Sequence, residues 1–286
     1  MKTLVFHPVT ERRLQQLVAT PSHAVGLVAP TGAGKSATAQ WVIARILGVE
    51  DISSYPYYRH IAPENNQLSI EQVREIEQFV GLKTPGTHAI RRAVLIEDAE
   101  SLSLPAQQAL LKTLEEPPAD TIIILTLRDE RAVLPTIRSR LQIIKLRQPI
   151  AEDLKEHFVK TYSEPAVQAA YALSGGQPGL LHDLLDESLE HPLKANMTTA
   201  KQLMQASAFE RLALIDGLSK DKTQALAVLD AASRLAQAGL RQAASKHDDK
   251  LLQRWQRLLQ STESTTAALQ ANGQAKLALT AFVLAL

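Results

Sequence analysis

The sequence contains no cysteine, few aromatic residues and no long apolar run. Without cysteine, a chain has no disulfide, no thiolate nucleophile and no cysteine-ligated zinc. Aromatic residues make up 4% of the chain, too few for a surface on which nucleic-acid bases stack. Apolar runs such as Ile122 to Leu125 are far too short to cross a bilayer. Charged residues such as Arg12 and Arg13 replace the apolar core that a signal peptide needs. We therefore expect a cytoplasmic protein without membrane contact.

Length and charge set further bounds. The 286 residues, 45% hydrophobic and 21% charged, are typical of a soluble globular chain with about two or three domains. The formal net charge is only +1. A broad basic field is therefore not expected, and any contact with nucleic acid must be local or shared with partner proteins.

Short apolar runs alternate with helical patterns in the first 150 residues. Strands are predicted at 24–28, 58–62, 93–96, 121–126 and 143–146. The intervening helical segments include one that Ser69 and Gln72 open as a capping box, and one that Ser103 caps before Pro105. The alternation predicts a five-stranded parallel sheet covered by helices on both faces.

After Pro149 the pattern becomes helical. Segments 152–162, 165–173 and 180–189 are separated by a Gly- and Pro-containing break, and 193–286 is rich in Ala, Leu, Gln and Lys. No stretch there alternates with the period of two that a strand requires, so we expect an all-helical domain of about five helices. The predicted domains are 1–150, 151–192 and 193–286.

The first predicted strand runs into a phosphate-binding P-loop. Two glycines of this loop can adopt backbone angles that turn successive amides inward, and the following helix directs its free N-terminal amides toward a phosphate. Its lysine brings a mobile cation to the terminal phosphates, and its serine offers a hydroxyl to Mg²⁺. The loop residues are Ala29, Pro30, Thr31, Gly32, Ala33, Gly34, Lys35 and Ser36.

Two carboxylates follow the strand at 93–96. An ATPase needs one carboxylate to hold Mg²⁺ and another to position the attacking water, and Glu97 and Asp98 are the candidates. The usual order is Asp and then Glu. Because the order is reversed here, Asp98 reaches less far toward a water, and we expect slow hydrolysis. The alternative is an acidic turn that merely ends a strand.

Two more positions are candidates. Thr126, at a predicted strand end, is a possible sensor of the γ-phosphate, although a core threonine is almost equally consistent. Thr126 is the first residue of the stretch Thr126-Leu127-Arg128-Asp129. This stretch lacks the lysine of the motif with which GTPases recognise guanine, so we expect the site to bind adenine. Arg140, after a short predicted helix, is placed to reach a neighbouring subunit's nucleotide, whereas spacing alone favours a solvated turn.

Together these stretches resemble the AAA+ clamp-loader subunits of bacterial DNA polymerase III, the delta-prime and gamma/tau group. The resemblance rests on the P-loop, on Ile96 to Glu100, on Ala106-Gln107-Gln108-Ala109-Leu110-Leu111-Lys112-Thr113-Leu114-Glu115-Glu116-Pro117-Pro118, and on Leu134 to Arg140. It covers about residues 7 to 180. It implies an α/β P-loop AAA+ domain with sheet order 5-1-4-3-2, a small helical lid at 151–192 and an all-α collar at 193–286.

The resemblance also implies a function. It predicts an ATP- and Mg²⁺-dependent subunit of a hetero-pentameric ring that loads a sliding clamp onto primed DNA, with Arg140 as a finger acting in trans. Three departures qualify it: no four-cysteine zinc module, so no zinc is expected; the reversed Glu97-Asp98; and Leu180 where relatives place a sensor arginine. The last two departures favour a delta-prime type of subunit. Another AAA+ ATPase, of DNA-remodelling or initiator type, and a non-hydrolysing scaffold of the same ring are the alternatives.

Overall fold

Five strands form one parallel sheet with the order β2-β3-β4-β1-β5. The strands are β1 (Ala24–Val28), β2 (Tyr58–Ile61), β3 (Arg92–Ile96), β4 (Thr121–Leu127) and β5 (Gln142–Lys145). The computed structural model describes residues 4–271 and 273–284. Read from the other edge, the strand order is the predicted 5-1-4-3-2, so the predicted sheet is confirmed.

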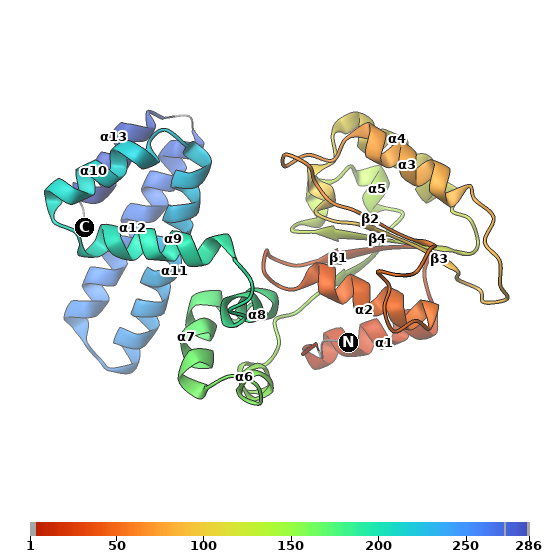
Figure 1. Ribbon diagram of the computed structural model, residues 1–286, viewed down its shortest axis with the longest axis horizontal. Coiled ribbons are helices and arrows are strands. Elements are labelled where there is room, and N and C mark those ends of the chain that lie inside the picture. Colours follow the sequence, from red (N-terminus) through yellow and green to blue (C-terminus); the bar gives the residue numbers. More distant parts are fainter. Residues whose placement is uncertain (1–3, 272, 285–286) are drawn as a thin grey trace. The chain divides into compact units, whose positions relative to one another are not determined.

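Helices cover both faces of this sheet (Figure 1). On one face lie α1 (Pro8–Ala19) and α2 (Lys35–Leu47); on the other lie α3 (Ile70–Val80), α4 (Leu104–Glu115) and α5 (Pro135–Arg138). The sheet has a hydrophobic core on each face, and successive strand residues point to alternate cores. Ala93 and Leu95 pack toward α2, whereas Val94 and Ile96 pack toward α3 and α4. Because every residue of β1, β3 and β4 is buried, these strands are almost continuously apolar rather than alternating.

The predicted helix starts in this region are confirmed by their caps. The backbone N–H of Ser69 donates to Gln72 Oε1 at 2.9 Å, and the N–H of Gln72 donates to Ser69 Oγ at 3.3 Å. Ser103 Oγ accepts from the N–H of Ala106 at 3.3 Å. Short 3₁₀ turns, η1 (Ala99–Ser101) and η2 (Glu130–Ala132), follow β3 and β4.

The chain divides into two compact units. The residues up to His157 together with Gln177–Leu180 form one, and Phe158–Gly176 with the residues from Leu181 onward form the other. The remaining helices are α6 (Ala151–Val159), α7 (Glu164–Ser174), α8 (Pro178–Leu185), α9 (Pro192–Gln205), α10 (Ala208–Leu218), α11 (Lys222–Ser245), α12 (Asp249–Gln270) and α13 (Ala275–Leu284). The predicted boundaries at residues 150 and 192 stay a prediction. No helix in the described part of the chain combines the length and apolar character needed to cross a membrane.

The second unit is built around the pair of long helices α11 and α12, with α9 packed on α11. Gln224 of α11 donates to Asn196 Oδ1 of α9 at 2.9 Å. Arg211 of α10 donates to the carbonyl of Leu203, near the end of α9, at 2.9 Å. These bonds pair polar groups that the helix packing would otherwise leave unsatisfied.

Two helical glycines of this unit are expected to respond oppositely to replacement by alanine. A Cβ at Gly239 in α11 would overlap Cε2 and Cδ2 of Trp255, in the body of the indole ring, whereas a Cβ at Gly217 in α10 would meet nothing within 4 Å. Gly239→Ala should therefore lower the free energy of unfolding by about 1–3 kcal/mol. Gly217→Ala should raise it by up to about 1 kcal/mol because alanine loses less backbone entropy. Urea unfolding followed by circular dichroism measures both. Equal shifts in the same direction would contradict the packing of Trp255 on α11.

Candidate nucleotide site

The P-loop connects β1 to α2 and owes its shape to two left-handed glycines. Gly32 has φ of 83° and Gly34 has φ of 77°, values that side chains with a Cβ rarely adopt. The loop is tied to its surroundings at both ends. The N–H of Ala29 donates to the carbonyl of Leu127 at 3.0 Å, and Thr38 Oγ1 donates to the carbonyl of Gly34 at 2.8 Å.

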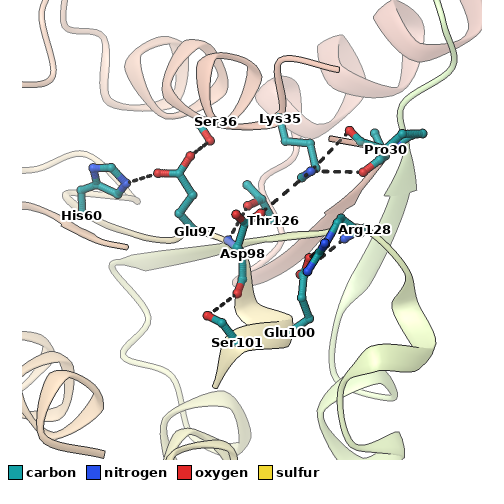
Figure 2. Close-up of polar contacts among 11 residues, drawn as sticks. Pro30, Lys35, Ser36, His60, Glu97, Asp98, Glu100, Ser101, Thr126 and Arg128 are labelled. Carbon is teal, nitrogen blue, oxygen red and sulfur yellow. Dashed lines mark hydrogen bonds and ion pairs between the residues drawn. The ribbon is translucent and has the colours of Figure 1, made fainter. Parts of the chain in front are cut away.

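Lys35, the first residue of α2, is only 8% exposed. Its Nζ donates to the carbonyls of Ala29 at 3.1 Å and Pro30 at 3.4 Å, and lies 4.0 Å from Asp98 Oδ1 (Figure 2). Burial lowers the pKa of the Lys35 ammonium, while the carboxylates of Asp98, Glu100 and Glu97 oppose that shift. The loop therefore carries a desolvated cation held by backbone carbonyls, a group suited to binding an anion.

Ser36 and Glu97 are brought into direct contact, as the sequence predicts for two ligands of one ion. Ser36 Oγ, at the start of α2, donates to Glu97 Oε1, directly after β3. The other carboxylate oxygen, Oε2, lies 2.8 Å from His60 Nε2. The hydrogen bond from His60 holds the pKa of Glu97 below its usual range, against the opposing effect of burial. A serine hydroxyl next to an ionised carboxylate provides the oxygen donors that Mg²⁺ prefers.

Asp98 occupies a strained position at the turn after β3. Its φ is 44° and ψ is 56°, a left-handed conformation that is uncommon for residues other than glycine, asparagine and aspartate. The N–H of Asp98 donates to Thr126 Oγ1 at 2.9 Å, and its carbonyl accepts from Ser101 Oγ at 2.7 Å. Burial raises the pKa of the Asp98 carboxyl, with Lys35 opposing that effect. The side chain remains 49% exposed, beside the lysine and open to solvent.

Thr126 is fully buried in β4 and accepts the hydrogen bond from Asp98. This contact lets Thr126 hold the turn that carries both carboxylates. Its predicted part in sensing a phosphate stays a prediction.

Three side chains at this site were not predicted from the sequence. His60 follows Tyr58 by two residues in β2. Because side chains alternate along a strand, His60 lies on the same face of the sheet as Tyr58, the face that α2 covers. Glu100 is nearly buried, with a side chain 7% exposed, and pairs with Nε of Arg128 at 2.5 Å. The roles of His60, Glu100 and Arg128 were not evident from spacing, because each contact joins residues that lie at or just after the ends of different strands.

The start of α8 lies against the P-loop. The N–H of Leu180 donates to the carbonyl of Gly32 at 2.9 Å. A Cβ at Gly179 would lie 2.8 Å from Gly32 O and 2.9 Å from Gly34 N, so only glycine fits at this approach. Next to it is a pocket whose lining includes Pro30, Ala33, Arg147 and Gln177. Leu180 is buried here, where the sequence lacks the expected sensor arginine.

Arg140 is not part of this cluster. Its Nη2 donates to Glu115 Oε1 at 2.7 Å, and its Nη1 donates to the carbonyl of Thr136 at 2.8 Å. Both partners lie on the side of the sheet that carries α4 and α5. The structure therefore separates Arg140 from Lys35, Ser36, Glu97 and Asp98, which it brings together.

The fold and the loop define a P-loop α/β domain of the AAA+ type, and comparison with known proteins agrees. Residues 9–149 match the family described as DNA polymerase III, delta subunit. The chain is 32% identical to DNA polymerase III subunit delta′ of Pseudomonas aeruginosa over 178 residues, and 36% identical to that of Escherichia coli over 130 residues. These alignments cover 55% and 44% of this chain, and 54% and 38% of the two relatives. The chain thus spans about half or less of the length of these curated relatives.

A solved structure shares the fold over nearly the whole chain. The DNA polymerase III gamma subunit-related protein of Thermotoga maritima superposes with a TM-score of 0.60 and 19% sequence identity, covering 96% of this chain and 97% of that one. Over residues 9–149 the chain is thus similar to the delta-prime subunits of bacterial DNA polymerase III. The resemblance predicted from its motifs is confirmed.

Proposed function

We propose that this chain is an ATP-binding subunit of a bacterial clamp loader, acting with sister subunits in a hetero-pentameric ring that places a sliding clamp on primed DNA. The observation that carries the proposal is the complete P-loop, in which Lys35 and Ser36 face Glu97 and Asp98. A loop retained only as a structural turn has no need of a desolvated lysine and a serine against a carboxylate.

Each residue has a separate task in this proposal. The amides after Gly32 and the ammonium of Lys35 bind the phosphates, and Ser36 and Glu97 hold Mg²⁺. When bound, the ion neutralises charge on the β- and γ-phosphates. Asp98 orients the attacking water, and the pocket beside Pro30 and Gln177 takes the adenine. Arg140 serves a neighbouring subunit's nucleotide.

A second candidate, a subunit that binds ATP without cleaving it, is favoured by two observations. Asp98 is a short carboxylate held in a left-handed turn, and the side chain at residue 180 is an apolar leucine rather than an arginine. Both features reduce the groups available to a transition state. Phosphate release by the isolated chain distinguishes the two: turnover at a rate typical of AAA+ motors would exclude the non-hydrolysing subunit.

Lys35→Ala tests the binding step. The substitution removes the buried cation of the loop, so the affinity for ATP should fall by at least about tenfold, or about 1.4 kcal/mol. Isothermal titration with ATP and MgCl₂ measures it. Lys83→Ala, at an exposed position, is the matched control and should bind as wild type. Equal affinities of wild type and Lys35→Ala, or no binding by wild type, would show that the loop does not serve ATP.

A further inference from the structure

His60 occupies the end of the edge strand β2 nearest the predicted metal ligands. In the parallel pairing of β2 with β3, His60 lies opposite Leu95 and Ile61 opposite Ile96. The rings of Tyr58 and His60 stack with centroids 6.5 Å apart and planes inclined by 20°. Since Tyr58 packs into the core beneath α2, His60 projects on the same face, toward the helix that begins at Lys35.

Glu97 is anchored to β2 through both its backbone and its side chain. Its N–H donates to the carbonyl of Ile61 at 2.9 Å. Its Oε2 accepts from His60 Nε2 at 2.8 Å, while Oε1 accepts from Ser36 Oγ. Figure 2 shows the carboxylate lying between the imidazole on one side and the serine on the other. One oxygen is thus occupied by His60, and the other is turned to the P-loop.

The hydrogen bond from His60 compensates for the greater conformational freedom of a glutamate at this position. Glutamate has one more rotatable bond than aspartate, and fixing a side-chain rotamer costs conformational entropy. A second hydrogen-bonded partner that holds a ligand in its binding orientation raises metal affinity, commonly by about 10–100-fold. His60 removes the additional freedom of Glu97 before any ion binds.

We propose that His60 is a positioning residue that holds the Glu97 carboxylate with Oε1 directed to Ser36, and that it thereby sets the affinity of the nucleotide site for its divalent cation. This inference rests on the proposed function, because it requires that Ser36 and Glu97 take up a cation together with ATP. It assigns His60 no contact with the nucleotide or with the reacting atoms.

The test is a titration with MgCl₂ at fixed ATP, compared with ATP binding in EDTA. His60→Ala should raise the MgCl₂ concentration at half-saturation by about tenfold, while the affinity for ATP in EDTA stays within about twofold of wild type. Because free ATP chelates the same amount of metal in every series, the difference between variants reports the protein. Electron paramagnetic resonance of MnCl₂ bound to the ATP-loaded chain gives the same comparison without any turnover.

Two further variants separate positioning from a structural role. His60→Gln keeps an N–H donor at similar reach and should restore most of the metal affinity. His88→Ala, which removes an exposed histidine, should match wild type. A purely structural role would lower the melting temperature of His60→Ala in EDTA and leave its metal midpoint unchanged.

The outcomes also distinguish this inference from the proposal beneath it. If wild type binds ATP with a clear MgCl₂ dependence and His60→Ala shows the same midpoint, the positioning role is wrong and the proposed function stands. If wild type binds ATP neither with MgCl₂ nor in EDTA, both are wrong. A metal midpoint shifted in His60→Ala and His60→Gln alike would also overturn the role of the N–H donor.

Discussion

Arg92→Met is expected to lower the free energy of unfolding by about 3 kcal/mol. Arg92 begins β3, is 1% exposed and is among the largest fully buried side chains of the described residues. Its Nη1 and Nη2 donate to the carbonyls of Val80 and Leu82, which lie at the end of α3 and just after it. Its guanidinium also lies 5.5 Å from the centre of the Phe79 ring.

The size of this effect follows from the groups that Arg92 satisfies. The last carbonyls of a helix have no partner within the helix, and a cation there also faces the negative end of the helix dipole. Methionine fills most of the space but leaves the buried carbonyl of Val80, at the end of α3, and the partly buried carbonyl of Leu82 without this donor. An unsatisfied buried acceptor costs about 1–3 kcal/mol. Arg92→Lys keeps the charge without the fork of donors and should fall between wild type and Arg92→Met.

Urea unfolding measures this effect, provided that the signal reports the unfolding of the unit that contains Arg92. The chain has two tryptophans, Trp41 in α2 and Trp255 in α12, so Trp41 fluorescence in a Trp255→Phe background follows the N-terminal unit alone. Arg74→Met, on the exposed side of α3, is the control and should change stability by less than about 0.5 kcal/mol. A similarly small change for Arg92→Met would mean that the buried guanidinium contributes nothing net.

Local features of the sequence predicted most of the N-terminal fold. Apolar runs indicated β1, β3, β4 and β5, the stretch that ends at Pro63 indicated β2, and the caps at Ser69 and Ser103 placed the starts of α3 and α4. Boundaries at prolines were less accurate. Helix α8 begins at Pro178, two residues before its predicted start at residue 180, and α1 likewise begins at a proline, Pro8. In both cases proline occupies the first turn of the helix, where its missing N–H costs nothing.

Contacts between residues at the ends of different strands could not be predicted from the sequence. Glu97 meets His60 across 37 positions and Glu100 meets Arg128 across 28, and each contact depends on the register of neighbouring strands. Periodicity predicts which face a side chain occupies, but register decides which residue lies opposite. The left-handed backbone of Asp98 is likewise set by its hydrogen bond to Thr126 in the next strand. A chemical motif can therefore be located from its residues, while its supporting partners require the assembled sheet.

Arg140→Ala separates a ring subunit from a solitary ATPase. Arg140 lies after α5 and is held by Glu115 and the carbonyl of Thr136, with its side chain 33% exposed. It contacts none of the P-loop side chains in the described structure. Its loss should therefore leave ATP binding by this chain unchanged. Because exposed ion pairs contribute little, the free energy of unfolding should change by no more than about 0.5 kcal/mol.

The expected effect lies instead in a neighbouring subunit. A cation supplied in trans stabilises the charge that develops on the transferred phosphoryl group, and in P-loop enzymes it accounts for about 10³-fold or more in rate. The experiment is to assemble the ring with Arg140→Ala in this subunit alone and to measure ATP hydrolysis stimulated by clamp and primed DNA. Because only one site among several is affected, the total ATP turnover of the ring should decrease by a smaller factor than the hydrolysis rate at that site.

Arg138→Ala supplies the matched control. Arg138 is an exposed arginine at the end of α5, two residues from Arg140, and its removal changes the net charge of the surface by the same amount. If the effect of Arg140 came from general electrostatics, both variants would depress stimulated hydrolysis alike. If Arg140 acts on a neighbour's nucleotide, the ring with Arg140→Ala should assemble normally but hydrolyse ATP slowly at one site and load clamps poorly. The ring with Arg138→Ala should behave as wild type. Wild-type hydrolysis and loading by Arg140→Ala would remove the finger from the mechanism and leave Arg140 as a partner of Glu115.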